Sequence, residues 1–197
     1  MMLFHNRQKN ITNLIPHLQL NGAPIEMVKE FNFLGITFDE FMSWKSHINK
    51  ISSKIACTIG TLTRLKRFLP KHILITLYNT LILPHINYGI LTWGNNINRI
   101  QKLQKWAIRT VTNSKYNAHC DPLFKNLSLL KACDIYHISE LKFYFKYMND
   151  TLPAYFKNML QHIHPTHMYE TRNRERALPN VAKTVSSSKT IRYASLN

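Results

Sequence analysis

The apolar positions of residues 1–40 follow the pattern of short β-strands. An apolar run, MMLFH, opens the chain, and Asn21-Gly22 is a strong signal for a hairpin turn between two strands. The run FNFLGITFD, residues 31–39, predicts a third strand that is mostly buried. Gly35 inside this run indicates a bulge or a close approach of backbone.

From Ser43 onward the apolar residues recur every three or four positions, which predicts a helix over residues 43–69. The predicted inner face comprises Trp44, Ile48, Ile51, Ile55, Ile59, Leu62 and Leu69. Ser43 is expected to cap this helix, with Asp39 and Glu40 near the positive end of its dipole. Pro70 is expected to end it and is also suited to open the next helix.

Residues 72–98 contain no Lys, Arg, Asp or Glu, and two interpretations of this segment are open. A membrane span is one of them, because cations flank the segment at both ends. A buried helix followed by a turn is the other. It is favoured because Pro84 and several polar residues interrupt the apolar run.

Further helices are predicted after the charge-free segment. The inner face of a helix over residues 96–112 comprises Ile97, Ile100, Ala107 and Val111. Helix is expected again between residues 122 and 160, where the aromatic residues of IYHISELKFYFKYM supply core. Beyond residue 165 the chain is polar and rich in Arg and Ser, and an extended or mobile tail is expected.

These patterns predict an α+β chain that is mainly α. Four regions follow one another: a β segment at 1–40, a basic helical region at 41–115, a second helical region at 116–164, and the polar tail at 165–197. The length is sufficient for a real hydrophobic core.

Positive charge is concentrated in the first helical region. The chain has a formal net charge of +16, and residues 41–120 contain twelve Lys and Arg residues but no Asp or Glu. A folded segment of this kind cannot neutralise its own field, so nucleic acid is favoured over a generic basic surface. The twelve cations are Lys45, Lys50, Lys54, Arg64, Lys66, Arg67, Lys71, Arg99, Lys102, Lys105, Arg109 and Lys115.

Trp106 lies among the cations of the helix predicted over residues 96–112. Arg99, Lys102, Trp106 and Arg109 share one side of that helix. A tryptophan in this setting can stack on a base of a nucleic acid. It can equally form the edge of the core, and the sequence leaves both interpretations open.

Candidate catalytic groups and metal ligands are scarce. Asp39 and Glu40 are interpreted as helix-capping acids rather than metal ligands, because no second pair of carboxylates follows nearby. His162, His164 and His167 lie close together, but no Cys or acid stands at ligand spacing, so a solvated loop is favoured over a metal site. No phosphate-loop, dinucleotide or hydrolase motif occurs, and the residues favour binding over bond-making.

Cysteine usage and the first residues bear on location. The chain has three cysteines without CxxC spacing, and its start has no apolar run long enough for a signal peptide. A reducing intracellular setting is expected, and the sequence does not distinguish nucleus from cytoplasm.

Several segments of the chain occur in an order that is typical of one family. The first two are MMLFHNRQ and VKEFNFLGITFDEFMSWKSHI, which contains the Leu-Gly pair and the Trp-x-x-His spacing. LYNTLILPHINYGILTWG and IQKLQKWAIRTVTN follow, and HCDPLFKNLSLLKACDIY and TRNRERALP continue the pattern. In this order they resemble the downstream portion of reverse transcriptases from non-LTR retrotransposons, particularly the jockey-like elements.

The resemblance implies the end of a polymerase palm, followed by a helical thumb and a connecting region. Phe33, Leu34 and Gly35 would form the primer grip, whose turn supports the 3′ end of the growing strand. Phosphate-facing residues on the first thumb helix would be Lys45, His47, Lys50 and Lys54. A second basic face would comprise Arg99, Lys102, Lys105 and Arg109, with Trp106 beside them. The implied partner is an RNA/DNA primer–template duplex.

The resemblance also implies what the chain lacks. Such polymerases hold two magnesium ions with three aspartates, and the upstream palm and fingers that carry them are expected to precede Met1. No Asp-Asp pair occurs in the sequence, so we assign no catalytic residue or cofactor, and Mg²⁺ is expected only in the complete polymerase. Both ends of the chain are expected to be truncated. We predict an inactive fragment that binds duplex without sequence preference; the alternatives are a transposon relic without function and a domesticated helical interaction module.

Overall fold

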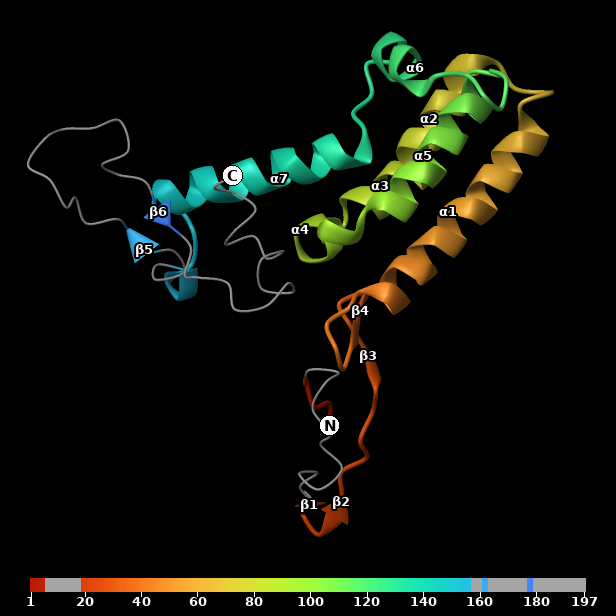
Figure 1. The fold of residues 1–197 in the computed structure, drawn as a ribbon. Coiled ribbons are helices and arrows are strands. Elements are labelled where there is room, and N and C mark those ends of the chain that lie inside the picture. Colours follow the sequence, from red (N-terminus) through yellow and green to blue (C-terminus); the bar gives the residue numbers. More distant parts are fainter. Residues whose placement is uncertain (6–18, 157–160, 163–176, 179–197) are drawn as a thin grey trace, which may run out of the picture. The chain divides into compact units, whose positions relative to one another are not determined.

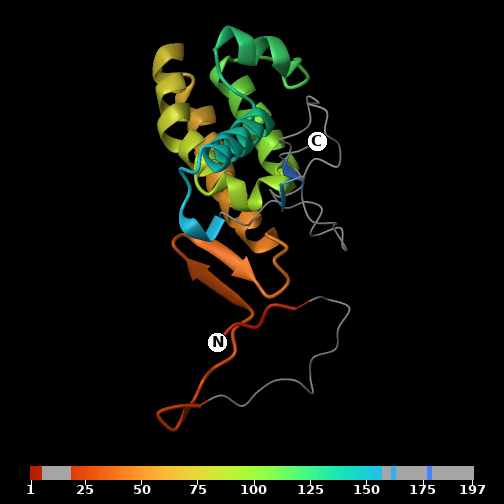
Figure 2. The ribbon, with the colours of Figure 1, turned by 90° about the vertical axis from the view of Figure 1, so that its left-hand side faces the viewer.

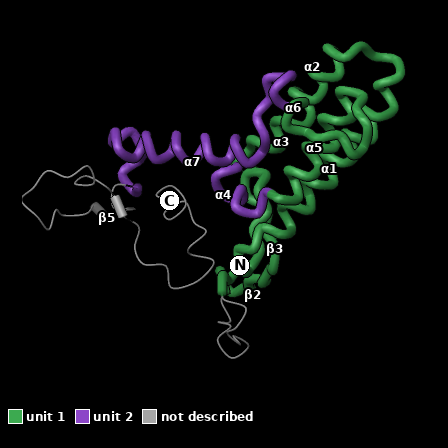
Figure 3. Tube along the Cα trace, turned by 45° about the horizontal axis from the view of Figure 1, so that its top comes forward, with its two compact units in different colours: residues 1–89, 98–123 green, residues 90–97, 124–197 purple. Residues whose placement is uncertain are grey.

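The computed structural model describes residues 1–5, 19–156, 161–162 and 177–178, and Figure 1 labels its elements. The chain is mainly helical with small two-stranded antiparallel sheets, so the predicted α+β, mainly α class is confirmed. It divides into two units, which Figure 3 shows in two colours. Unit 1 comprises residues 1–89 and 98–123, and unit 2 comprises residues 90–97 and 124–197.

The β segment of unit 1 consists of hairpins. Strand β1 (Gln19–Leu20) pairs with β2 (Ala23–Pro24) around Asn21-Gly22, as predicted. The run FNFLGITFD, however, is not one buried strand. It forms most of β3 (Glu30–Phe33) and all of β4 (Ile36–Asp39), which pair in antiparallel register around a turn at Leu34-Gly35. All of β3 is exposed, and only Thr37 and Asp39 of β4 are buried.

The first five residues do not form the strand that their apolar pattern predicts. They are attached to the hairpin segment by main-chain hydrogen bonds at both ends. Val28 N–H donates to the carbonyl of Met1 over 2.9 Å, and His5 N–H donates to the carbonyl of Glu40 over 3.0 Å. The expected continuation of this strand, through residue 8, lies outside the described residues.

Helix α1 (Lys45–Leu65) has the predicted inner face over most of its length. Ile48, Ile51, Ile55, Ile59 and Leu62 are all buried. At the ends the prediction is wrong. Trp44 is half-buried and contacts Phe38 with ring centroids 5.3 Å apart, while Leu69 lies beyond the helix end.

The start of α1 is ordered by an acid together with the predicted serine. Trp44 precedes the helix with a φ of 61° and forms no side-chain cap, while the Ser43 hydroxyl accepts a long hydrogen bond, 3.4 Å, from the Lys45 N–H. Asp39 accepts hydrogen bonds from the main chain of Phe41 and Ser43 and from the Ser43 hydroxyl, at 2.9–3.1 Å. This carboxylate fixes the turn that leads from β4 into α1, which accounts for its burial.

The charge-free segment is divided by its proline, as predicted. Helix α2 (Lys71–Leu81) ends just before α3 (Leu83–Asn87), and the short α4 (Ile90–Trp93) and the 3₁₀ turn η2 (Gly94–Asn96) follow. Pro84 stands in the first turn of α3, where its missing N–H is tolerated. In the part of the chain that the structure describes, no helix has the length and apolar character needed to cross a membrane.

Helices α1 and α5 (Asn98–Val111) form the centre of unit 1 and run in the same direction. Arg99 donates to the Asn49 side chain near the start of both helices, and Lys66 donates to the Asn113 side chain at 3.1 Å near the end of both. Helix α2 packs on both, and its buried Tyr78 hydroxyl accepts a hydrogen bond from buried Gln104 at 2.8 Å. Figure 2 shows the β3–β4 hairpin at the N-terminal end of α1.

Unit 2 is built around α7 (Ala132–Met148), which packs on α4. Trp93 is fully buried, and Tyr136 donates to the Asn95 side chain at 2.9 Å. The expectation that the aromatic run of α7 supplies core is correct for Tyr136 and Tyr147 but wrong for Phe145, which is 68% exposed. The reason is that apolar residues lie on all sides of α7, and neighbours cover only one of them in the described residues.

The remaining elements are short. Helix α6 (Cys120–Asn126) precedes α7, and the 3₁₀ turn η3 (Ala154–Phe156) follows it. Strands β5 (Gln161–His162) and β6 (Ala177–Leu178) pair with each other. His164, His167 and most of the predicted tail lie outside the described residues, so the predicted histidine cluster is not tested.

Candidate nucleic-acid interface

The turn predicted as the primer grip lies at the exposed tip of the β3–β4 hairpin. Phe33, Leu34 and Gly35 are all exposed, Leu34 to 73%. Leu34 and Gly35 have φ angles of 48° and 79°, and a two-residue hairpin turn with two positive φ angles matches the twist of its strands. Gly35 is therefore a turn residue and not a bulge.

This turn differs from the other hairpin turn in one residue type. Asn21-Gly22 has φ angles of 52° and 80°, almost the same as those of Leu34-Gly35. Asn tolerates the left-handed region, whereas Leu does so only at a cost in free energy. The positive φ angle is unfavourable for Leu34, and its side chain is not buried against other described residues. An unfavourable conformation without a gain in packing is typical of a residue with a binding role.

His47 connects the hairpin to α1. The Thr37 N–H donates to its Nδ1 at 3.2 Å, and Lys50 Nζ donates to the Thr37 hydroxyl at 3.1 Å. His47 is only 3% exposed, and burial, assisted by the charges of Lys50 and Lys54, lowers its pKa. A buried imidazole that accepts a main-chain hydrogen bond is poorly placed for the predicted phosphate contact, which stays a prediction.

The other predicted cations of α1 are at the surface. Lys45, Lys50 and Lys54 are all exposed. Lys50 and Lys54 lie on the side of α1 that is turned away from its buried isoleucines, whereas Lys45 lies nearer one edge of the core face. Two of the three thus form an exposed basic side along the N-terminal half of the helix.

Helix α5 presents its basic residues on one side, as predicted. Arg99 and Lys102 are exposed, while Lys105 and Arg109 are half-buried. Arg109 Nε donates to the carbonyl of Ala118 at 3.0 Å and so holds the loop after the helix. Trp106 is 44% exposed, which leaves a large part of its ring available to a ligand.

None of the twelve cations between residues 41 and 120 forms an ion pair with a carboxylate in the described residues. The side chains of four of them donate hydrogen bonds within the described residues, and in each case the acceptor is neutral. These acceptors are the Thr37 hydroxyl, the Asn49 and Asn113 side chains and the Ala118 carbonyl. These twelve positive charges are therefore not neutralised by direct ion pairs among the described residues.

Tyr88 is a residue of this site that the sequence did not reveal. Its hydroxyl donates to the carbonyl of Leu34, and a Cβ added to Gly35 would lie 3.5 Å from its ring. Tyr88 belongs to the Tyr-Gly pair of the segment LYNTLILPHINYGILTWG. No rule based on sequence spacing connects it with a turn 54 residues away.

The acids of unit 1 do not form a metal site with their neighbours. The Asp39 carboxylate accepts main-chain N–H groups, and Glu40 Oε2 lies 3.6 Å from His5 Nε2. Among the described residues no group of three or more His, Cys, Asp or Glu side chains is arranged to hold a metal ion.

Two curated proteins of Drosophila melanogaster are similar to this chain. The RNA-directed DNA polymerase from mobile element jockey is 23% identical over 134 residues, which cover 64% of this chain and 14% of that protein. The predicted resemblance to jockey-like reverse transcriptases is confirmed. A second retrotransposon reverse transcriptase, the probable RNA-directed DNA polymerase from transposon BS, is 26% identical over 131 residues, or 61% of this chain and 14% of that protein.

The similarity to these reverse transcriptases is partial. The chain matches only 14% of the length of each of the two polymerases. No protein-family model matches the chain, and no solved structure matches it. The relationship supports a reverse-transcriptase-like region, and the roles of the residues within it are matters for a proposal.

Proposed function

We propose that this chain is a segment of a non-LTR retrotransposon reverse transcriptase that grips the primer–template duplex and does not itself join nucleotides. The β segment at residues 1–40 is the end of the palm, residues 41–115 form the thumb, and residues 116–164 belong to the connecting region. The single observation that carries this proposal is the set of twelve cations without a carboxylate partner on and around the adjacent helices α1 and α5.

The two helices offer a surface suited to a phosphate backbone. Lys54 and Lys102 are exposed, and neither ammonium group forms a hydrogen bond or ion pair with another described residue. Lysines of this kind contact phosphates without reading the base sequence. Trp106 adds an exposed aromatic face on the same side of α5 as Lys102, which suits stacking on an unpaired base next to the duplex.

The Leu34-Gly35 turn supplies a second type of contact. The main-chain N–H of Gly35 has no acceptor among the described residues, and Gly35 is exposed. A main-chain N–H at an exposed turn can donate to a phosphate or sugar oxygen of the primer strand. The absence of a Cβ lets the strand approach the main chain closely.

The upstream palm and fingers are the proposed protein partner. Strand β3 pairs with β4, and its other edge pairs with no strand in the part of the chain that the structure describes. The exposed rings of Phe31 and Phe33 lie on one face of this short hairpin. A two-stranded sheet with an exposed apolar face is only marginally stable, so additional strands from the polymerase would complete it.

The test is a salt titration of binding to an RNA/DNA duplex. If roughly six phosphates are contacted, the logarithm of the binding constant falls with the logarithm of salt concentration with a slope of about −5. The double variant Lys54→Gln/Lys102→Gln should reduce the magnitude of this slope by about 2. A matched control, Lys142→Gln/Lys146→Gln on the exposed side of α7, changes the net charge equally and should leave the slope unchanged.

Two results would contradict the proposal. A binding constant of the unsubstituted chain that does not change with salt concentration would contradict binding to the phosphates of the duplex. Incorporation of nucleotide by the chain on a primed template with Mg²⁺ would contradict the absence of catalysis.

A second candidate function is that of a helical interaction module, and a specific observation favours it. Leu141, Phe145 and Met148 are exposed on α7 at spacings of four and three, which forms an apolar stripe in unit 2. A module of this kind would bind a protein partner with little dependence on salt. A relic without function would instead aggregate through this stripe and through β3, and would not melt cooperatively.

A further inference from the structure

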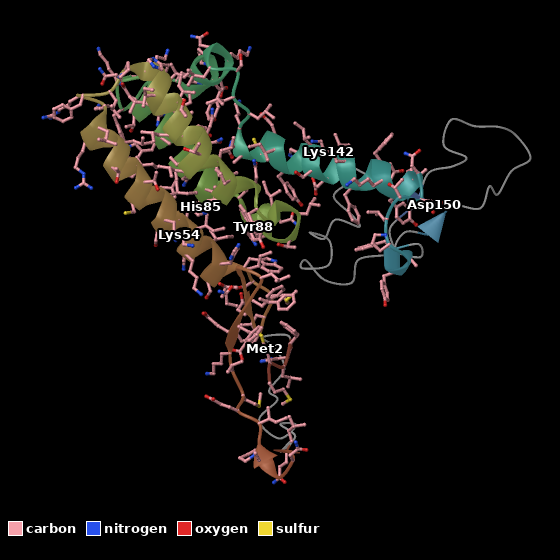
Figure 4. The ribbon with its side chains drawn as sticks, turned by 180° about the vertical axis from the view of Figure 1, so that it is seen from behind. Met2, Lys54, His85, Tyr88, Lys142 and Asp150 are labelled. Carbon is pink, nitrogen blue, oxygen red and sulfur yellow. The ribbon has the colours of Figure 1, made fainter. Side chains whose placement is uncertain are left out.

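Tyr88 ties the exposed turn to the helices of unit 1. It directly follows α3, where Figure 4 labels it, and its hydroxyl donates to the carbonyl of Leu34. The Tyr88 ring lies in van der Waals contact distance, 3.5 Å, of the position that a Cβ on Gly35 would occupy. One side chain thus bonds to the first central residue of the turn and lies beside the second.

The hydrogen bond from Tyr88 stabilises a turn conformation that is unfavourable for the residue type at position 34. Leu34 has a φ of 48°, in a region that L-residues with large side chains rarely adopt. The Asn21-Gly22 turn reaches nearly the same conformation with a residue that tolerates it, and no side chain bonds to its carbonyls in the described residues. The Leu34 conformation is therefore held from outside the hairpin.

The hydrogen bond from Tyr88 to the Leu34 carbonyl also fixes the direction of the Gly35 main-chain N–H. The structure contains no cis peptide bond among the described residues, so the carbonyl of Leu34 and the N–H of Gly35 point in opposite directions from their shared peptide group. Because the carbonyl faces Tyr88, the N–H faces away from Tyr88. Rotation of this peptide group would turn the N–H away from its present direction.

We propose that Tyr88 is a positioning residue for the primer-strand contact: it holds the Leu34–Gly35 peptide group so that the Gly35 N–H and the Leu34 side chain meet the end of the primer. The inference rests on the proposed function, because the turn meets a primer only if the chain binds the duplex. It goes further by giving the turn a preference for a recessed 3′ end over fully paired duplex.

The test uses the full chain and the variant Tyr88→Phe, which keeps the ring and removes the hydroxyl. The matched control is Tyr116→Phe, at an exposed tyrosine outside the turn and both basic helices. Binding is measured by fluorescence anisotropy for two RNA/DNA duplexes, one with a recessed 3′ end and one fully paired. Amide hydrogen exchange of residues 33–36 is measured in the absence of nucleic acid.

We expect the parent chain and Tyr116→Phe to prefer the recessed end. Tyr88→Phe should lose this preference by on the order of fivefold, the ratio that corresponds to one hydrogen bond. Its affinity for fully paired duplex and its salt slope should not change, because the basic helices are intact. Exchange of the turn amides should become faster in Tyr88→Phe alone.

The outcomes separate the two proposals. Normal salt-dependent binding with an unchanged preference and unchanged exchange in Tyr88→Phe would overturn the role of Tyr88 and leave the duplex grip in place. A parent chain that does not bind duplex would overturn the proposed function and, with it, the primer role of the turn. Faster amide exchange of the turn in Tyr88→Phe, with an unchanged preference for the recessed 3′ end, would show that Tyr88 has only a structural role. That result would also overturn the inference.

Discussion

The main-chain N–H of Thr37 donates a hydrogen bond to Nδ1 of His47 over 3.2 Å, and this bond attaches the β3–β4 hairpin to the first turn of α1. Only a deprotonated ring nitrogen can accept it. Burial, and then the charges of Lys50 and Lys54, lower the pKa of His47 below its ordinary value near 6.5, which keeps the ring neutral. Protonation of Nδ1 would therefore break this bond between β4 and α1.

The first prediction concerns pH. Because the pKa of His47 is lower in the folded chain than in the unfolded one, the unfolded chain binds more protons as pH falls below about 6.5. The contribution of His47 to folding stability is fully present above pH 6.5. As pH falls below this value the contribution decreases, and the decrease ends once pH is below the lowered pKa of the folded chain. Thermal melts between pH 7.5 and pH 5, with amide exchange at Thr37, would measure the loss.

A matched pair of variants isolates His47. His47→Asn should flatten the pH dependence, whereas His119→Asn, at an exposed histidine, should leave it as in the parent. Equal pH dependence in the parent and in His47→Asn would contradict the prediction.

The second prediction exchanges residues between the two hairpin turns. Leu34→Asn should stabilise the β3–β4 hairpin by about 1 kcal/mol, because Asn adopts positive φ more readily than Leu. If Leu34 contacts the primer, the same variant should bind recessed 3′ ends more weakly. Calorimetry and anisotropy on one preparation give both quantities.

The reciprocal variant, Asn21→Leu, is the control for this exchange. It should destabilise the β1–β2 hairpin by a similar amount and leave nucleic-acid binding unchanged. Tighter binding of primer ends by Leu34→Asn would show that Leu34 is not a contact residue.

The third prediction separates two cations of α5. Lys102→Ala should weaken duplex binding and reduce the magnitude of the salt slope by about 1, with an unchanged melting temperature, because Lys102 has no partner in the described residues. Arg109→Ala should in addition lower stability by roughly 1–2 kcal/mol, because its hydrogen bond to the Ala118 carbonyl is lost. An unchanged melting temperature for Arg109→Ala would argue against that structural contact.

The fourth prediction concerns Gly94 in unit 2. A Cβ at this position would lie 2.2 Å from Cδ2 of the Tyr136 ring, so either the ring or the main chain must move. We expect Gly94→Ala to destabilise the packing of α7 on α4 by about 2 kcal/mol. Chemical denaturation followed by tryptophan fluorescence is a suitable measurement, because Trp93 is fully buried next to the site.

Gly60 provides the control for Gly94. It lies inside α1 with nothing within 4 Å of an added Cβ. Gly60→Ala should stabilise the chain by roughly 0.5–1 kcal/mol through helix propensity. Destabilisation by both variants would indicate that the Tyr136 contact is not the cause.

Local sequence rules were sufficient where neighbouring residues decide the structure. The Asn21-Gly22 hairpin, the inner face of α1 from Ile48 to Leu62 and the break before Pro84 are all as predicted. The turn depends on the residue types at its two central positions, the inner face on the spacing of apolar residues, and the break on the missing N–H of proline. Each of these causes involves only residues close together in the sequence.

The same rules failed where distant contacts decide. No local signal favours a turn with Leu at positive φ, so local rules predict a single strand for FNFLGITFD. His47 has the helical position of a surface residue, and only the contact of β4 with α1 buries it. The bond from Tyr88 to Leu34 joins residues 54 positions apart, which no periodicity can indicate.

The candidate surface was predictable in composition but not in geometry. Counting charges identified the twelve cations, and periodicity placed Arg99, Lys102, Trp106 and Arg109 on one side of α5. It could not show that α5 runs parallel to α1, nor that Arg109 holds the Ala118 carbonyl. These facts depend on how the helices pack.

The parallel alignment of α1 and α5 is secured at each end by a cation bound to an asparagine, Arg99 to Asn49 and Lys66 to Asn113. An amide oxygen accepts a hydrogen bond without carrying a negative charge, so these two contacts hold the helices together without neutralising either cation. Aspartate in place of either asparagine would strengthen the contact between the helices but would cancel part of their positive charge. The helix pair therefore combines a fixed alignment with an undiminished positive charge only because the acceptor at both ends is uncharged.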